Sequence, residues 1–187
     1  MNKYLRALAV IPTGAVKMGL LKLAHGGRFH GPALCQVSPR SEITVERGAS
    51  LSIGPGFKMR DGAKLRVRRG AVCTMGKNVS LNSNNFLVCR ESITLGDDIM
   101  LSPNVQIYDH DHDYRAEGGI KAMQFKTAPV VIGSNVWIGA NTVILRGTVI
   151  GDNCVIGAGC VVRGEIPANS VVTQKRETEL RIREAAP

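Results

Sequence analysis

Residues 132–166 read IGSNVWIGANTVILRGTVIGDNCVIGAGCVVRGEI, a segment in which a branched apolar residue recurs at every sixth position. A small or branched residue follows four places after each of these, and glycine often follows directly. Neither helical nor ordinary strand periodicity holds a six-residue phase, so the segment is a structural repeat. Because one such unit cannot bury its own apolar side chain, the units must stack into a coil with a continuous core. The leading positions are Ile132, Ile138, Ile144, Ile150, Ile156 and Val162.

The length and composition set the class of protein. A chain of 187 residues is long enough for one domain with a sizeable core. Its formal charge of +9 is compatible with nucleic acid, an anionic membrane face, an acidic polymer or a phosphate-bearing co-substrate. Aromatic residues make up only 4% of the chain, which is too few for a base-stacking platform, and no helix-turn-helix or RNA-binding signature occurs. We therefore do not expect nucleic acid as a partner.

The five cysteines include no CxxC pair, and this pattern favours a reducing compartment over a disulfide framework. Cys154 and Cys160 occupy repeat positions where a small apolar residue belongs, so we expect them to be core thiols. The sequence predicts a cytoplasmic protein, with the inner face of the membrane as a further option.

Residues 1–40 are predicted to form an N-terminal amphipathic helical segment followed by a loop. Within residues 1–24 the apolar run contains Pro12 and Gly14, so we expect two short amphipathic helices broken near Pro12. The run is too short to span a bilayer. We favour packing of these helices on the flank of the domain or of a neighbouring subunit. The alternative is peripheral contact with an anionic membrane surface, apolar face down.

Residues 41–173 are predicted to form the repeat domain. A less regular version of the repeat covers residues 43–87, and its phase drifts between Met75 and Leu95, which we attribute to bulged corners. The phase fails over residues 108–131, where we expect an extruded loop, because a long excursion from a regular repeat is usually functional or disordered. The charged tail, residues 174–187, is expected to be helical.

The repeats Ile132-Gly-Ser-Asn-Val-Trp-Ile-Gly and Ile150-Gly-Asp-Asn-Cys-Val-Ile-Gly-Ala-Gly resemble those of the hexapeptide-repeat acyltransferases. The similarity is greatest to the galactoside and maltose O-acetyltransferase branch. It implies an all-β fold, a left-handed parallel β-helix of triangular section, which is an exception to the right-handed crossover rule. It also implies a homotrimer with active sites in clefts between subunits, and acetyl-CoA as co-substrate.

The extruded loop begins with Tyr108-Asp109-His110-Asp111-His112, the densest cluster of polar side chains in the chain. Acetyl transfer to a hydroxyl needs a base, and histidine titrates in the right range. The family setting Asn-Val-x-Ile-Tyr-x-x-x-His leads from Asn104 to His112, so we favour His112 as the base over His110. Any of Asp109, Asp111 and Asp113 is a candidate to orient the imidazole. The same residues suggest a metal site, but histidines on adjacent coils are missing, so no metal is expected.

The resemblance also implies binding residues. On the acetyl-CoA side, the backbone N–H of Ala140 is expected to donate a hydrogen bond to the oxyanion that forms during transfer. The other predicted contacts to acetyl-CoA are Trp137, Ala158, Arg163, Gly164 and, in place of the usual family ending, Lys175 or Arg176. The predicted contacts to the acceptor are Asn82, Asn84, Arg90 and Asp109. Arg90 stands where the family has an acid, which puts galactoside specificity in doubt and suits an anionic or differently shaped acceptor.

The sequence therefore predicts an O-acetyltransferase that moves an acetyl group directly from acetyl-CoA to a hydroxyl of a sugar or polysaccharide precursor. One alternative is an N-acetyltransferase acting on an amino sugar or an amino acid. The other is a non-catalytic β-helix that serves as a scaffold at the membrane surface.

Overall fold

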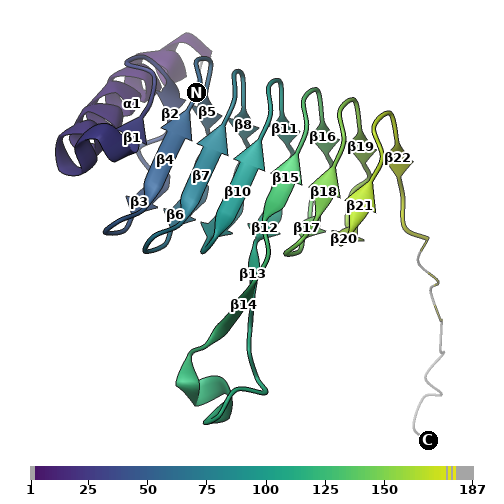
Figure 1. The fold of residues 1–187 in the computed structure, drawn as a ribbon. Helices are drawn as coiled ribbons and strands as arrows, with labels where there is room; N and C mark the ends of the chain where they lie inside the picture. Colours follow the sequence, from purple (N-terminus) through teal and green to yellow (C-terminus); the bar gives the residue numbers. More distant parts are fainter. Residues whose placement is uncertain (1–2, 176, 178, 180–187) are drawn as a thin grey trace, which may run out of the picture.

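Three parallel sheets wind around one axis in the computed structural model, which describes residues 3–175, 177 and 179 (Figure 1). Each turn contributes one strand to each sheet, so the expected left-handed parallel β-helix is confirmed. Sheet A contains β1 (Phe29–His30), β4 (Ser50–Ile53), β7 (Val72–Met75), β10 (Ser92–Leu95), β15 (Val130–Ile132), β18 (Val149–Ile150) and β21 (Glu165–Ile166). Sheet B contains β2 (Gln36–Val37), β5 (Lys58–Met59), β8 (Ser80–Leu81), β11 (Met100–Leu101), β16 (Trp137–Ile138), β19 (Val155–Ile156) and β22 (Val171–Val172). Sheet C contains β3 (Glu42–Val45), β6 (Lys64–Val67), β9 (Phe86–Cys89), β12 (Gln106–Tyr108), β17 (Val143–Ile144) and β20 (Val161–Val162).

The strand register explains why the repeat is regular only in the second half of the chain. Ile132 pairs with Ile150, so that turn takes 18 residues, or three hexapeptides. Leu51 pairs with Cys73, and Cys73 with Ile93, so those turns take 22 and 20 residues. In sheets A and C the strands from β3 to β10 are four residues long, whereas the later ones are mostly two. The phase drift therefore comes from longer strands together with a shorter connection between β9 and β10, and our attribution to bulged corners is wrong.

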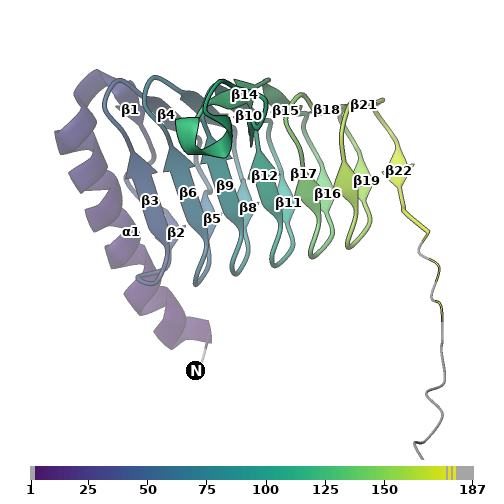
Figure 2. The same ribbon diagram turned by 90° about the horizontal axis from the view of Figure 1, so that it is seen from below.

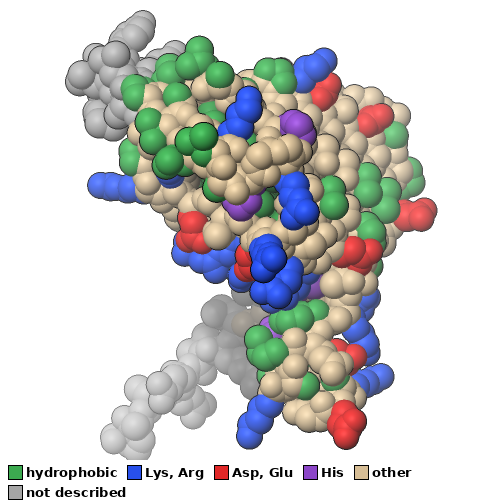
Figure 3. Space-filling view, turned by 60° about the vertical axis from the view of Figure 1, so that its left-hand side comes forward, with side chains coloured by type: hydrophobic (Ala, Val, Ile, Leu, Met, Phe, Trp, Pro, Cys, Tyr) green, Lys and Arg blue, Asp and Glu red, His purple; other side chains and the backbone are tan. Residues whose placement is uncertain are grey.

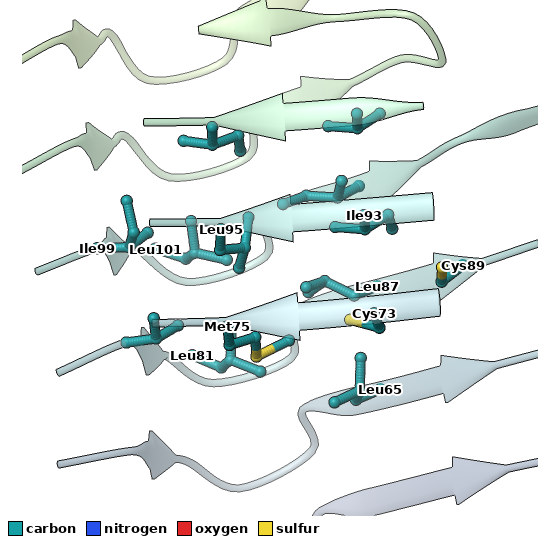
Figure 4. Packing of buried hydrophobic residues seen from close by; sticks show 14 of the residues in the cluster. Leu65, Cys73, Met75, Leu81, Leu87, Cys89, Ile93, Leu95, Ile99 and Leu101 are labelled. Carbon is teal, nitrogen blue, oxygen red and sulfur yellow. The ribbon is translucent and has the colours of Figure 1, made fainter. Parts of the chain in front are cut away.

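The leading residues of the repeats form the core. All six point inwards and are at least 96% buried, as the six-residue pattern requires. Figure 4 shows the same stacking in the earlier turns, where side chains of successive coils form columns such as Leu65 on Leu87 and Cys73 on Ile93. Burying each large apolar side chain contributes about 1.5–3 kcal/mol. All five cysteines are buried free thiols, and the core positions expected for Cys154 and Cys160 are confirmed.

Asparagine side chains line the turns between sheets A and B. Asn135, Asn153 and Asn169 adopt the left-handed backbone conformation, which asparagine tolerates better than most residues. Their amides also form a ladder along the axis, since Nδ2 of Asn135 donates to Oδ1 of Asn153 at 3.0 Å and Nδ2 of Asn153 donates to Asn169 at 3.1 Å. The asparagine of the repeat thus serves both the turn and the stacking of one coil on the next.

The first turn of the prism is covered by α1 (Lys3–His25), a single helix that continues through Pro12 (Figure 2). Our prediction of two short helices broken at Pro12 is wrong because packing on the coil holds the helix together. Met18 is buried against the core, and a Cβ at Gly14 would lie 2.3 Å from the carbonyl oxygen of Cys35. The favoured expectation, packing on the flank of the domain, is observed. No helix of the described residues is long and apolar enough to cross a bilayer.

Both ends of the repeat domain differ from the expected boundaries in detail. The segment predicted as a loop, residues 25–40, contains β1 and β2 and a short 3-10 helix, η1 (Gly26–Arg28), so the coil begins earlier than residue 41. At the other end, the side chain of Gln174 pairs with the backbone N–H and C=O of Val161, in the manner of a further strand. Most of the predicted C-terminal helix lies outside the described residues, and Gln174 and Lys175 are not helical.

Substitution of Gly139 tests the close stacking of the turns. A methyl group at this position would lie 2.5 Å from the backbone nitrogen of Ala158 in the next coil. We expect Gly139→Ala to lower the free energy of unfolding by about 1–3 kcal/mol. Gly19→Ala is the matched control, because Gly19 lies in α1 with nothing within 4 Å of an added Cβ, and it should raise stability by about 0.5–1 kcal/mol. Denaturant unfolding of both variants measures the difference, and equal effects would contradict the close stacking.

Candidate active site

The predicted extruded loop is a projecting hairpin, which we call the arm, residues 109–129 (Figure 1). It leaves sheet C after β12 and returns to sheet A at β15. Its strands β13 (His110–His112) and β14 (Phe125–Thr127) pair antiparallel, with His112 opposite Phe125. A short 3-10 helix, η2 (Gly119–Ala122), forms its far end. The excursion is thus ordered at its base, where the candidate histidines lie.

Asp109 fixes the base of the arm to the coil. Its fully buried carboxylate accepts hydrogen bonds from the backbone N–H of Arg90 at 2.8 Å and 2.9 Å and of Glu91 at 2.7 Å. Burial alone would raise the pKa of Asp109, but the bonds to His110 and to these two N–H groups outweigh it and lower the pKa. Asp109 is therefore a buried anion with engaged oxygens, and our expectation that it contacts the acceptor is wrong.

His110 is held by this carboxylate. Its Nδ1 lies 3.1 Å from Oδ1 of Asp109, and its side chain is only 12% exposed. The ring packs edge-on against Tyr108 and Phe125, with centroid distances of 5.9 Å and 5.6 Å. Because Nδ1 faces a carboxylate, Nε2 is the nitrogen that remains for other chemistry.

His112 is exposed and packs only on the arm. Its ring centroid lies 4.5 Å from that of Phe125. Within the described part of the chain, no hydrogen bond engages its ring nitrogens. The other two aspartates are used elsewhere, since Asp111 pairs with Arg146 at 2.5 Å and Asp113 with Lys126 at 3.1 Å. Of the three candidate orienting acids, Asp109 thus acts on His110, and none of the three is hydrogen-bonded to His112.

Arg90 completes this cluster. It lies in the two-residue connection between β9 and β10, and its Cζ is 3.4 Å from the centroid of Phe125. Arg90, His110 and His112 therefore share one aromatic ring. Our reading of the sequence missed Phe125. The signal for it was weak, because Phe125 is one of several apolar residues scattered through a polar excursion.

Most of the predicted acetyl-donor residues lie away from the arm. Trp137 points outwards from sheet B with 51% of its surface exposed, and its Nε1 donates to Oγ of Ser102 at 2.9 Å. It is flanked by Met100 and Val155 of the neighbouring coils. A surface groove of about 390 Å³ runs past it and includes Asn135.

We call the turns from sheet B to sheet C the B–C edge, and those from sheet C to sheet A the C–A edge. Ala140 and Ala158 lie on the B–C edge in successive coils, and among the described residues nothing accepts a hydrogen bond from the Ala140 N–H. Asn82 and Asn84 lie on the same edge two coils earlier. Asn82 is half-buried and accepts from the N–H of Ser83, and Asn84 is an exposed left-handed turn residue.

The predicted site residues therefore divide between two edges of the prism. The C–A edge carries the arm with both histidines, Arg90, and also Arg163 and Gly164. The B–C edge and the adjoining face of sheet B carry the remaining coil residues. A strand of sheet C separates the two edges in every turn. Lys175 lies beyond the last strand, and Arg176 is outside the described residues.

Metal ligands are not gathered at either edge. In the part of the chain that the structure describes, no group of three or more His, Cys, Asp or Glu side chains is arranged to hold an ion. The polar chemistry of the site is that of imidazole, guanidinium and backbone N–H groups, which suits acid–base transfer and stabilisation of an anion.

Comparison with known proteins gives the family. Residues 129–164 match the model "Bacterial transferase hexapeptide (six repeats)". WbbJ of Escherichia coli (strain K12), provisionally named a lipopolysaccharide biosynthesis O-acetyl transferase, is 33% identical over 136 residues, which cover 68% of this chain and 69% of WbbJ.

Solved structures share the fold. The N-acyltransferase AntD of Bacillus cereus, in complex with dTDP and 3-hydroxybutyryl-CoA, is 20% identical with a TM-score of 0.65, over 83% of this chain and 81% of AntD. A galactoside acetyltransferase in complex with coenzyme A is 22% identical with a TM-score of 0.53, over 91% of this chain and 86% of that one. By sequence and architecture together, the chain belongs to the bacterial hexapeptide-repeat transferases.

Proposed function

We propose that the protein is an O-acetyltransferase that moves an acetyl group from acetyl-CoA to a hydroxyl of a sugar or polysaccharide precursor. The observation that carries this proposal is the pair of imidazoles at the base of the arm, one held by a buried carboxylate and the other open to solvent. The name of WbbJ supports a lipopolysaccharide-related sugar as acceptor, and the coenzyme A complex of a galactoside acetyltransferase with the same fold supports the donor.

The division of the site between two edges supports a homotrimer. A ring of three chains that sets the C–A edge of one against the B–C edge of the next would bring the histidines to Trp137 and Ala140. The far end of the arm exposes three large apolar side chains that a neighbour would cover, since such patches usually mark contact sites. These side chains are Tyr114, Ile120 and Met123.

In this assembly the transfer is direct. His112 accepts the hydroxyl proton as the acceptor oxygen attacks the carbonyl carbon of the thioester. The N–H of Ala140, which has no acceptor in the described chain, donates to the oxygen that becomes negative. The carbon–sulfur bond then breaks, and the imidazolium returns its proton to the leaving thiolate. His112 is our proposed base because it is accessible, whereas His110 is packed between rings and bonded to Asp109.

Contact of the first helix with a membrane stays a prediction. Val16, Leu20 and Leu23 of α1 lie on one helical face and are exposed, and Lys22 stands beside them. An apolar strip with a cation at its border suits an anionic bilayer surface at the inner face of the membrane, and salt-sensitive vesicle binding is its measurement.

Substitution of the two histidines tests the mechanism. We expect His112→Ala to lower kcat by roughly 10²- to 10⁴-fold while the assembly stays intact, because the base is lost. His110→Ala is the matched comparison and should have a smaller effect. Thiol release from acetyl-CoA with a panel of sugars measures turnover, and gel filtration measures the assembly.

Two outcomes would change the assignment. Near-normal turnover in His112→Ala together with an inactive His110→Ala would make His110 the base. Transfer to amino sugars or amino acids but not to hydroxyls would replace O-acetyl transfer by N-acetyl transfer. Normal thiol release in both single variants would contradict histidine catalysis.

Substitution of Asp109 tests how the arm is held. In Asp109→Asn the amide NH₂ faces N–H donors, so we expect the free energy of unfolding to fall by about 2–3 kcal/mol and kcat to fall with it. Because the folded-state pKa of Asp109 is lowered, its stabilisation is present above the ordinary pKa of 3.8 and is lost as the pH falls through the folded value.

Asp111→Asn is the matched control, because Asp111 forms an exposed ion pair worth about 0–1 kcal/mol. Urea unfolding at pH 7 and in acid compares the two variants with the unchanged protein. Equal stability of both variants at pH 7 would contradict the role given to Asp109.

A further inference from the structure

Arg90 differs from the two arginines that precede it along this side of the coil. Arg66 pairs with Glu42 at 2.7 Å, and Arg68 pairs with Glu46 at 2.6 Å. In the described structure no hydrogen bond or ion pair engages the guanidinium of Arg90, and its Nε is buried without an acceptor. Arg90 is thus a partly buried cation without a carboxylate of its own.

The acids near Arg90 are already occupied. The carboxylate of Asp109 accepts the backbone N–H groups of Arg90 and Glu91 and faces His110. Glu46 accepts from Arg68 and from the backbone N–H of Arg69 at 3.0 Å. Burial, followed by the charge of Arg68, lowers the pKa of Arg90, although an arginine remains charged at neutral pH. A desolvated cation without an anionic partner is unfavourable unless a ligand supplies the anion.

The guanidinium packs on the same aromatic ring as the candidate base. Its Cζ is 3.4 Å from the centroid of Phe125, and both imidazoles contact the same ring. Figure 3 shows Lys and Arg side chains gathered on the coils where the arm leaves them. An anion bound to Arg90 would therefore lie at the same edge of the prism as the proposed base.

We infer that the acceptor carries a carboxylate or a phosphate close to its reacting hydroxyl, and that Arg90 binds this group. The planar guanidinium matches the two oxygens of either anion. This inference rests on the proposed acetyl transfer and adds the class of acceptor to it: an acidic sugar, or a sugar bearing a phosphate.

The competing explanation is that Arg90 only anchors the arm through Phe125. The two explanations predict different effects when the Arg90 side chain is removed. Loss of an anchor lowers turnover with every acceptor, whereas loss of an anion site raises KM for charged acceptors and leaves neutral ones unaffected.

The test uses three probes: glucuronic acid, glucose 1-phosphate and glucose. For the unchanged protein we expect a kcat/KM for one of the two acidic probes at least about tenfold above that for glucose. Arg90→Gln should raise KM for that probe by about 10- to 100-fold, leave KM for acetyl-CoA unchanged and abolish the preference. The acidic probe that the protein prefers shows whether Arg90 binds a carboxylate or a phosphate. Arg66→Gln is the matched control, because Arg66 already has an acid partner, and it should change none of these values.

Other kinetic outcomes would overturn the inference. Glucose used as well as the acidic probes, equal losses with all three in Arg90→Gln, or a rise in KM for acetyl-CoA alone would each do so. In these cases acetyl transfer itself would still stand.

If none of the probes is acetylated, the inference is tested by measuring how tightly each probe binds. Calorimetric binding of an acidic probe at least about tenfold tighter than glucose, lost in Arg90→Gln, would support the anion site while counting against the proposed transfer. Equal binding of all three probes by both proteins would overturn the inference.

Discussion

Backbone hydrogen bonding between successive coils is the constraint on which the molecule depends. Parallel strands set neighbouring coils at a fixed spacing of about 4.8 Å, so residues of equivalent turns stack along each edge. An insertion is tolerated only if the chain returns in register. The arm does so, because Val130 resumes pairing with Ile93 and Ile144 with Ile107. Asp109 stabilises the point where the arm leaves the coil, because its carboxylate accepts from backbone N–H groups of the preceding coil.

This stacking also places the candidate site residues on two separate edges of the prism. The C–A edge carries the imidazoles and Arg90, and the B–C edge carries the N–H of Ala140, which has no acceptor among the described residues, close to Trp137. One chain cannot bring its own two edges together, because the strands of sheet C lie between them. The proposed active centre, built from both sets of residues, would therefore require a second copy, and we propose the exposed apolar end of the arm as part of the contact surface.

Local patterns predicted most of the fold. The period of residues 132–166 fixed the inward positions, because each of those turns takes three hexapeptides. It could not predict the earlier start at β1, since turns of 22 residues hide a six-residue phase. Pro12 led us to predict two helices, but packing on the coil overrides the tendency of proline to end a helix. At the site, the resemblance to the family indicated the two histidines as candidates. The pairing of His110 with Asp109 and the shared contact with Phe125 depend on the hairpin register, which the sequence does not encode locally.

The most direct test of a site shared between chains is activity in mixed assemblies. His112→Ala and Trp137→Ala carry lesions on different edges, and each protein alone should be inactive. When the two are co-expressed and assembled together, the account predicts recovery of about a quarter of the sites, because some contacts then join an intact histidine to an intact tryptophan. Mixed assemblies that form but release no more thiol than either variant alone would contradict it.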